Sequence, residues 1–199
     1  MFAYIKGILE MKFNGYVVID VGGIGYKIYM SQNAIKSLGD VGETIKVYTY
    51  HYVREDNISL YGFKTNEELK MFELLLSVSG IGAKSAIVML SKITPFSFAL
   101  AVITNDTSKL TKIPGIGAKT AARIVLELKD KLKSENESIK ENEEIQETLE
   151  SDTNVEEAVA ALQVLGYNRK EIKEVLGKID IKELSVEDII KQCLSKLGK

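Results

Sequence analysis

The sequence predicts an α+β protein of several domains, in which a small β-barrel precedes two all-helical parts. Three observations support this class. Residues 1–62 contain runs of β-branched and aromatic side chains separated by glycine turns. Residues 64–133 carry apolar residues at helical spacing together with a repeated glycine motif. Residues 153–199 contain three further amphipathic runs, which follow a stretch poor in large apolar side chains.

The N-terminal segment, residues 1–63, is expected to be a closed barrel of the OB type. About five short strands with one helix in this length suit that barrel, although other small barrels would share the pattern. The glycines of Gly22–Gly25 supply a turn between two strands, and Gln32–Leu38 can form the helix. The strands indicated by the pattern are Tyr16–Val21, Tyr26–Met30, Thr44–Tyr50 and Ile58–Tyr61.

An acidic pair, Glu55 and Asp56, lies where two of these strands should form a hairpin. A solvated turn is the ordinary interpretation, and an element that repels phosphate is a functional one. A metal site is a weaker interpretation, because two adjacent carboxylates rarely suffice. One histidine, His51, and one cysteine, Cys193, do not make a zinc site. We therefore expect no metal and no cofactor, and a structural role for His51.

The central segment, residues 64–133, is expected to be all-helical and basic. Thr65 and Glu68 have the spacing of a capping box, and Pro95 suits the first turn of another helix. The whole chain has a net charge of −2, but residues 63–133 carry 11 basic and 6 acidic side chains. A basic segment in an acidic chain is the part expected to face phosphate.

This segment contains an internal repeat, in which Val78–Ala86 recurs as Ile113–Ala121 after 35 residues. Each copy places Gly-Ile-Gly between two apolar helices, which is a helix-hairpin-helix motif. The glycines allow a tight turn and close approach of a ligand, and the isoleucine can lock the turn inward. The next helix begins there with free N–H groups and a positive dipole end, which suits a phosphate oxygen. Such contacts grip the DNA backbone and carry little base information.

The predicted DNA contacts fall at matching positions of the two motifs. They are Ser79, Gly80, Ile81, Gly82, Lys84 and Ser85 in the first, and Pro114, Gly115, Ile116, Gly117, Lys119, Thr120 and Arg123 in the second. An ordinary helix connection with glycine at the C-cap is the alternative. A dinucleotide-binding loop would need a preceding strand, and a Walker A loop a different glycine spacing.

The rest of the chain is acidic. Residues 134–152 are rich in Glu, Asn and Ser and are expected to be a flexible linker, with a transient helix over Glu141–Glu150 as the competing interpretation. Residues 153–199 are expected to form a three-helix docking domain, with helix starts at Asn168 and Ser185. No apolar run is long enough to span a membrane, and the N-terminus lacks a signal-peptide core, so a cytoplasmic location is expected.

Three segments outside the glycine motifs complete a signature that covers the chain. They are Val21–Tyr26, Val53–Asp56 followed by Leu60–Phe63, and Ala160–Tyr167. Together with both motifs, they make the chain resemble the RuvA family, which binds four-way (Holliday) junctions in recombination and repair. The resemblance implies a UBA-like C-terminal domain, a non-catalytic role, and homotetramers, of which one or two stack on a junction held open and square.

The resemblance also implies the roles of individual residues and partners. Glu55 and Asp56 match the family's acidic pin at the tetramer centre. The C-terminal domain would dock the hexameric AAA+ ATPase RuvB, and the junction resolvase RuvC would be a further partner. The matching docking residues, expected to be exposed, are Leu162, Leu165 and Tyr167, with the two leucines as core residues in the alternative. Ala118 departs from the family, where a basic residue is common.

Two other function classes compete with junction binding. A helix-hairpin-helix glycosylase or nuclease would need a catalytic Lys or Asp in a pocket, and the only aspartate soon after the second motif is Asp130. A pure interaction adaptor would show no salt-sensitive binding to DNA, whereas phosphate contacts predict a steep loss of affinity with salt.

Overall fold

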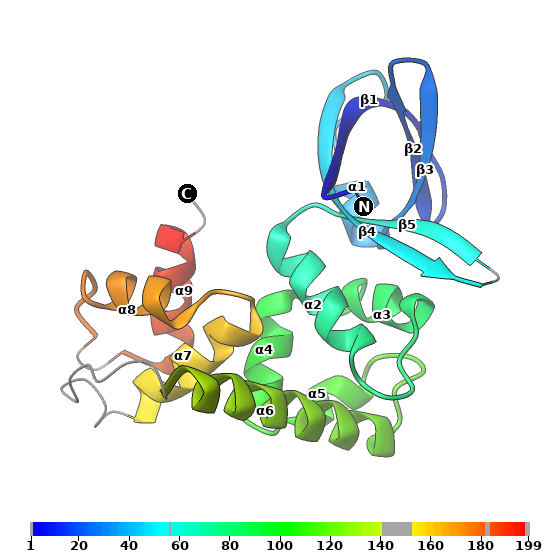
Figure 1. The fold of residues 1–199 in the computed structure, drawn as a ribbon. Coiled ribbons are helices and arrows are strands. Elements are labelled where there is room, and N and C mark those ends of the chain that lie inside the picture. The colour runs from blue at the N-terminus through cyan, green and yellow to red at the C-terminus, as the bar shows by residue number, and fades with distance from the viewer. Residues whose placement is uncertain (1, 56, 141–152, 182–183, 198–199) are drawn as a thin grey trace. The chain divides into compact units, whose positions relative to one another are not determined.

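The computed structural model describes residues 2–55, 57–140, 153–181 and 184–197 (Figure 1). The chain falls into two units, one formed by Met1–Ser77 with Ile81–Thr94 and the other by Val78–Gly80 with Pro95–Lys199. The predicted class is confirmed, since a β-barrel is followed by helices only. The predicted domain boundaries at residues 63, 133 and 152 stay a prediction.

Five strands close into a barrel with the order β1-β2-β3-β5-β4 (Figure 1). Their bounds are β1 Tyr4–Lys12, β2 Tyr16–Val21, β3 Ile24–Tyr29, β4 Thr44–Arg54 and β5 Asn57–Phe63. The β3–β5 pair is parallel and the other pairs are antiparallel. This is the OB-type barrel that the pattern favours.

Alternation along the strands fills the barrel. Residues of one parity point inward and are buried, namely Ile5, Leu9, Val17, Ile19, Ile28 and Val47. The turn between β2 and β3 consists of Gly22 and Gly23, whose φ angles of +64° and +88° explain the glycines. The short helix α1, Gln32–Lys36, packs Ala34 and Ile35 onto the same core, and the Ser31 hydroxyl caps it.

Two helices complete the first unit, α2 (Asn66–Leu76) and α3 (Ala83–Leu90). Thr65 caps α2 by accepting from the Glu68 N–H at 3.3 Å, as predicted. The Glu68 carboxylate accepts from the N–H of Lys64 at 2.8 Å, one residue before the predicted donor. Phe72 of α2 contacts the rings of Tyr50, Tyr61 and Phe63, which fixes the helix against β4 and β5.

The second unit contains the remaining six helices of the described residues. They are α4 (Pro95–Ile103), α5 (Thr107–Thr111), α6 (Ala118–Lys140), α7 (Thr153–Val164), α8 (Arg169–Leu176) and α9 (Val186–Leu197). Helix α6 continues through Lys140, into the segment predicted as a linker. Residues 141–152, including the competing helix Glu141–Glu150, lie outside the described residues.

The C-terminal helices begin where the sequence predicts. Asn168 and Glu171 form a reciprocal capping box at α8, and the Ser185 hydroxyl accepts from the Asp188 N–H at 3.2 Å, at the start of α9. Buried side chains from all three helices form the core of this part, among them Ala158, Ile172, Ile189 and Cys193.

Candidate nucleic-acid interface

The two glycine motifs adopt the same backbone conformation. Gly80 and Gly115, the first glycine of each motif, both have a φ of +86°, in the left-handed region that favours glycine. The isoleucine that follows is buried in both copies, with 6% of Ile81 and 7% of Ile116 exposed. The predicted inward packing of these isoleucines is thus confirmed. In each motif the buried isoleucine anchors the turn to the protein interior, and both glycines are exposed to solvent.

The second glycine of each motif, Gly82 or Gly117, is not required by the fold. Neither residue has a positive φ, and a Cβ atom built on either would meet no atom within 4 Å. Gly82 is the N-cap of α3, and no side chain caps that helix. The missing side chain therefore leaves the first turn of α3 open to a ligand. Free N–H groups at a helix start form a site for an anion such as phosphate.

Cationic and hydroxyl side chains surround these helix starts. Lys84 and Ser85 in the first turn of α3 are exposed, as is Lys119 at the equivalent position of α6. Thr120 is partly buried, and Pro114 is exposed. Of the predicted contact residues, the lysines and the glycines thus face solvent in both copies, whereas the isoleucines are buried and Thr120 is more buried than its equivalent Ser85.

Ser79 and Arg123 are engaged within the protein. The Arg123 guanidinium donates from Nη1 to the Ser79 carbonyl at 3.1 Å. The Ser79 N–H donates to the Glu127 carboxylate at 3.1 Å, and Glu127 lies 4.0 Å from Arg123 Nε. We call Ser79, Arg123 and Glu127 the turn clamp, because they fasten the first turn to α6. Sequence reasoning missed Glu127, although its spacing of four residues from Arg123 on one helix favours an ion pair.

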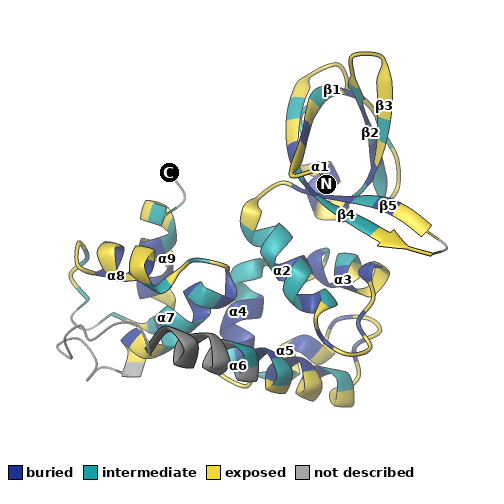
Figure 2. Cartoon of the chain, viewed as in Figure 1, coloured by how far each residue is buried: buried dark blue, intermediate teal, exposed yellow. Residues whose placement is uncertain are grey.

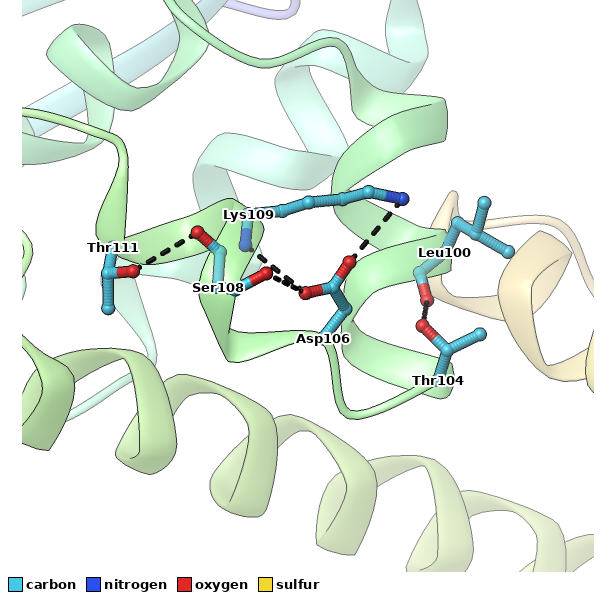
Figure 3. Close-up of polar contacts among 6 residues, drawn as sticks. All are labelled: Leu100, Thr104, Asp106, Ser108, Lys109 and Thr111. Atoms are coloured by element: carbon cyan, nitrogen blue, oxygen red, sulfur yellow. Dashed lines mark hydrogen bonds and ion pairs between the residues drawn. The ribbon is translucent and has the colours of Figure 1, made fainter.

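The second motif is preceded by the short helix α5, whose start is fixed by Asp106 (Figure 3). The Asp106 carboxylate accepts from the Ser108 hydroxyl at 2.5 Å and from the Lys109 N–H at 3.3 Å. The hydrogen bond from Ser108, assisted by the contacts with Lys109, lowers the pKa of the Asp106 carboxyl. Asn105, just before it, has a φ of +56°. Sequence reasoning did not identify this cap.

Glu55 lies at the predicted hairpin tip. Arg54 of β4 pairs with Asn57 of β5, and Glu55 lies in the turn that follows Arg54. Glu55 is exposed, and Asp56 lies outside the described residues. Beside the turn, Val53 and Ile58 are paired across the strands and exposed, two apolar side chains that sequence reasoning missed. Figure 2 shows the ends of β4 and β5 near this turn coloured as exposed.

The structure corrects the expected exposure of the docking residues. Leu162 is 0% exposed and Leu165 2%, so both are core residues, as the alternative held. They lie on the same apolar stripe as Val155 and Ala158, which predicts burial directly. Tyr167 follows α7 and is partly exposed.

In the described part of the chain, no single helix is long and apolar enough to cross a membrane, and only α3 and α4 taken together, as a bent pair, reach that length and composition. Among the same residues, no three His, Cys, Asp or Glu side chains come together as metal ligands would.

Comparison with known proteins decides the family. Residues 1–62 match the RuvA N terminal domain, residues 72–130 a SAM-like helix-hairpin-helix tandem, and residues 153–198 the RuvA C-terminal domain. The chain belongs to the RuvA family. The RuvA N terminal domain match covers the five strands of the barrel, and the RuvA C-terminal domain match covers helices α7 to α9.

Full-length relatives carry the same family name. The chain is 49% identical over 201 residues to the Holliday junction branch migration complex subunit RuvA of Acetivibrio thermocellus, with both chains covered completely. It is 48% identical over 199 residues to that of Ruminiclostridium cellulolyticum, which covers 99% of this chain and all of the relative. The Clostridium perfringens protein is 44% identical over 200 residues, with 99% of each chain covered.

Proposed function

We propose that this protein is the non-catalytic DNA-binding subunit of a branch migration complex, which recognises four-way junctions and recruits a motor ATPase. The observation that carries the proposal is the pair of equivalent turns, each with an exposed second glycine that the fold does not require. Two such phosphate sites on one chain suit the backbone of a DNA duplex better than a small ligand. The names of the full-length relatives support the same assignment.

The experiment for backbone gripping uses the two equivalent lysines. Lys84→Ala and Lys119→Ala should each weaken binding to a four-way junction and reduce the slope of log affinity against log salt by about 1. Lys170→Ala, at an exposed position of α8, serves as the control and should change neither quantity. An unchanged slope in both hairpin variants would contradict the proposal.

We propose that the subunits form a homotetramer that places Glu55 and Asp56 near the crossover of the junction. Carboxylates repel phosphate, so a ring of them disfavours intact duplex at that point. The Glu55→Gln/Asp56→Asn double variant should bind junctions as well as or better than the parent, while branch migration changes. A loss of junction binding would refute repulsion as their role.

The C-terminal helices are proposed to dock RuvB, with Tyr167 as the remaining candidate contact, since Leu162 and Leu165 are core residues. RuvC is a further proposed partner, and the cytoplasm is the proposed location. Tyr167→Ala should keep junction binding and lose stimulation of the RuvB ATPase on junction DNA. Unchanged stimulation would remove Tyr167 from the docking surface.

A further inference from the structure

An unbroken row of aromatic rings crosses the outside of the barrel. Tyr16 of β2, Tyr29 of β3 and Tyr61 of β5 are direct register partners, so they stand in line across three neighbouring strands. Their ring centroids are 6.1 and 5.7 Å apart. Phe13 extends the row at one end by stacking on Tyr16, with centroids 4.6 Å apart and an interplanar angle of 19°. Tyr52 of β4 extends it at the other, 5.9 Å from Tyr61.

We call Phe13, Tyr16, Tyr29, Tyr61 and Tyr52 the aromatic row. Tyr61 is buried beneath Phe72 of α2, whereas Phe13 is 43% exposed and Tyr16, Tyr29 and Tyr52 are partly exposed. Phe13 has no core to fill at its position, because it lies in the connection between β1 and β2. The exposed rings are therefore not explained by the hydrophobic core alone.

Positive charge accompanies the row. The Lys27 ammonium on β3 lies 4.3 Å from the centre of the Tyr16 ring and 5.0 Å from that of Tyr29. At the other end, the Arg54 guanidinium lies 5.1 Å from the Tyr52 ring, and its Nε donates to the Tyr52 hydroxyl at 3.1 Å. Aromatic faces accompanied by cations are what proteins use to bind single-stranded nucleic acid, where bases stack on rings and cations meet phosphates.

A cavity of about 310 Å³ opens beside the row. It forms where β3 and β5 diverge, because they pair only at Ile28–Leu60 and Tyr29–Tyr61 while β5 begins at Asn57. Its lining combines ring faces with hydrogen-bonding groups, namely Phe2, Tyr29, His51, Lys27, Asn57 and Ser59 with Ile58 and Leu60. Its volume is at the small end for ligand pockets, and its lining suits a planar base with polar edges.

We propose that this outer face of the barrel binds a segment of unpaired DNA strand, with bases stacked on Tyr16 and Tyr29, phosphate near Lys27 and one base in the cavity. The cavity lies next to the β4–β5 turn, since Asn57 both follows that turn and lines the cavity. This site goes beyond the proposed function, because it recognises bases of a single strand instead of duplex backbone. A DNA strand that separates from its partner strand at the Glu55 turn would reach this site first.

The test measures binding of the full-length protein to a fluorescent oligothymidine by anisotropy. Tyr16→Leu, Tyr29→Leu and Lys27→Gln should each weaken binding about tenfold, the effect expected for losing one stacked base or its phosphate contact. The chain supplies a matched control in Lys46, whose ammonium lies 4.5 Å from the Tyr4 ring and 4.8 Å from the Tyr48 ring with no lining role in the cavity. Lys46→Gln and Tyr48→Leu should bind as the parent does.

Three outcomes would overturn the proposal. The parent protein could fail to bind oligothymidine, or the control variants could lose as much affinity as the row variants. The row variants could instead keep their affinity and change the molar mass measured by light scattering, which would assign this face to contacts between copies of the chain. Junction binding measured in parallel separates the two proposals. Retained junction binding without strand binding refutes only the strand site, and the reverse refutes only the proposed function.

Discussion

The two glycines of each hairpin have different roles, the first in folding and the second in the proposed binding of DNA. This distinction is the most specific feature of the site. Gly80 and Gly115 occupy a backbone conformation that L side chains rarely adopt, so the fold itself selects glycine there. Gly82 and Gly117 occupy an ordinary conformation in open space, so only an approaching ligand would select glycine. Folding and binding can therefore be separated within a motif of three residues.

Alanine substitutions at the two glycine positions should separate the role in folding from the role in binding. Gly80→Ala and Gly115→Ala should each lower the free energy of unfolding by about 1–2 kcal/mol, the strain of a left-handed residue with a Cβ atom. Gly82→Ala and Gly117→Ala should cost less than about 1 kcal/mol and weaken junction binding about tenfold, because the methyl group blocks charge-assisted hydrogen bonds to phosphate. Urea unfolding and gel shifts on all four variants provide the measurement. Equal stability losses at both glycine positions would contradict the distinction.

The turn clamp gives Arg123 a structural task that competes with its predicted role on DNA. Arg123→Gln removes the bond to the Ser79 carbonyl and the ion pair with Glu127. If the clamp is its main role, junction affinity should fall while the salt slope stays unchanged, since no phosphate contact is lost. Affinity titrations at four salt concentrations measure both. A slope reduced by about 1 would instead return Arg123 to the list of phosphate contacts.

The Asp106 cap makes helix α5 sensitive to acid. Because the pKa of the Asp106 carboxyl is lowered in the folded protein, its contribution to stability is present above the ordinary pKa of an aspartate. The contribution is lost as the pH falls from that value through the lowered one. Asp106→Asn keeps an acceptor without the titration, so the stability difference between parent and variant should shrink in acid. Urea unfolding from pH 6 to pH 3 checks this, and a constant difference would contradict it.

The three C-terminal helices protect a single thiol. Cys193 of α9 is fully buried, and loss of solvent raises the pKa of its thiol. Thiolate is the reactive form, so a disulfide reagent at pH 8 should modify Cys193 slowly in the native protein and rapidly in urea. The native rate then reports the opening of this helical core. Rapid modification of the native protein, at the rate seen in urea, would show that the core is not closed.

Much of each element could be predicted from local patterns. The Gly-Gly turn, the Pro95 start and the caps at Asn168 and Ser185 depend on residues close in sequence, and all are found in the structure. Strand β1 was not identified, because Gly7 interrupts its β-rich pattern. That glycine is explained only by β2, since a Cβ atom there would lie 2.1 Å from the Asp20 carbonyl oxygen.

Long-range contacts could not be predicted from local sequence patterns. The hydrogen bonds of Ser79 with Arg123 and Glu127 join residues more than forty positions apart, and the register that lines up Tyr16, Tyr29 and Tyr61 depends on how the barrel closes. The burial of Leu162 and Leu165 was predictable, since their spacing with Val155 and Ala158 is that of a core stripe. The family resemblance instead assigns these two leucines to an exposed docking surface.

For the whole molecule, binding of DNA by the hairpins must be distinguished from the proposed selectivity for four-way junctions. The proposed backbone contacts at Gly82 and Gly117 would fit any duplex arm and would carry little base information. In the proposed assembly, preference for a junction would therefore come from how several subunits direct their hairpins along several arms at once. In the proposed tetramer, each arm of the junction adds phosphate contacts with further subunits. A linear duplex does not offer these additional contacts. Linked contacts of this kind raise the overall affinity.

The most direct measurement is a competition gel shift between a four-way junction and linear duplexes that carry the same arm sequences and the same total length, at fixed salt. Junction binding by subunits acting together predicts that the duplexes displace the labelled junction only at a large molar excess. The hairpin double variant Gly82→Ala/Gly117→Ala should lose affinity for both DNAs. Equal competition by junction and duplex for the parent protein would contradict the account, and would leave a general duplex-binding protein in its place.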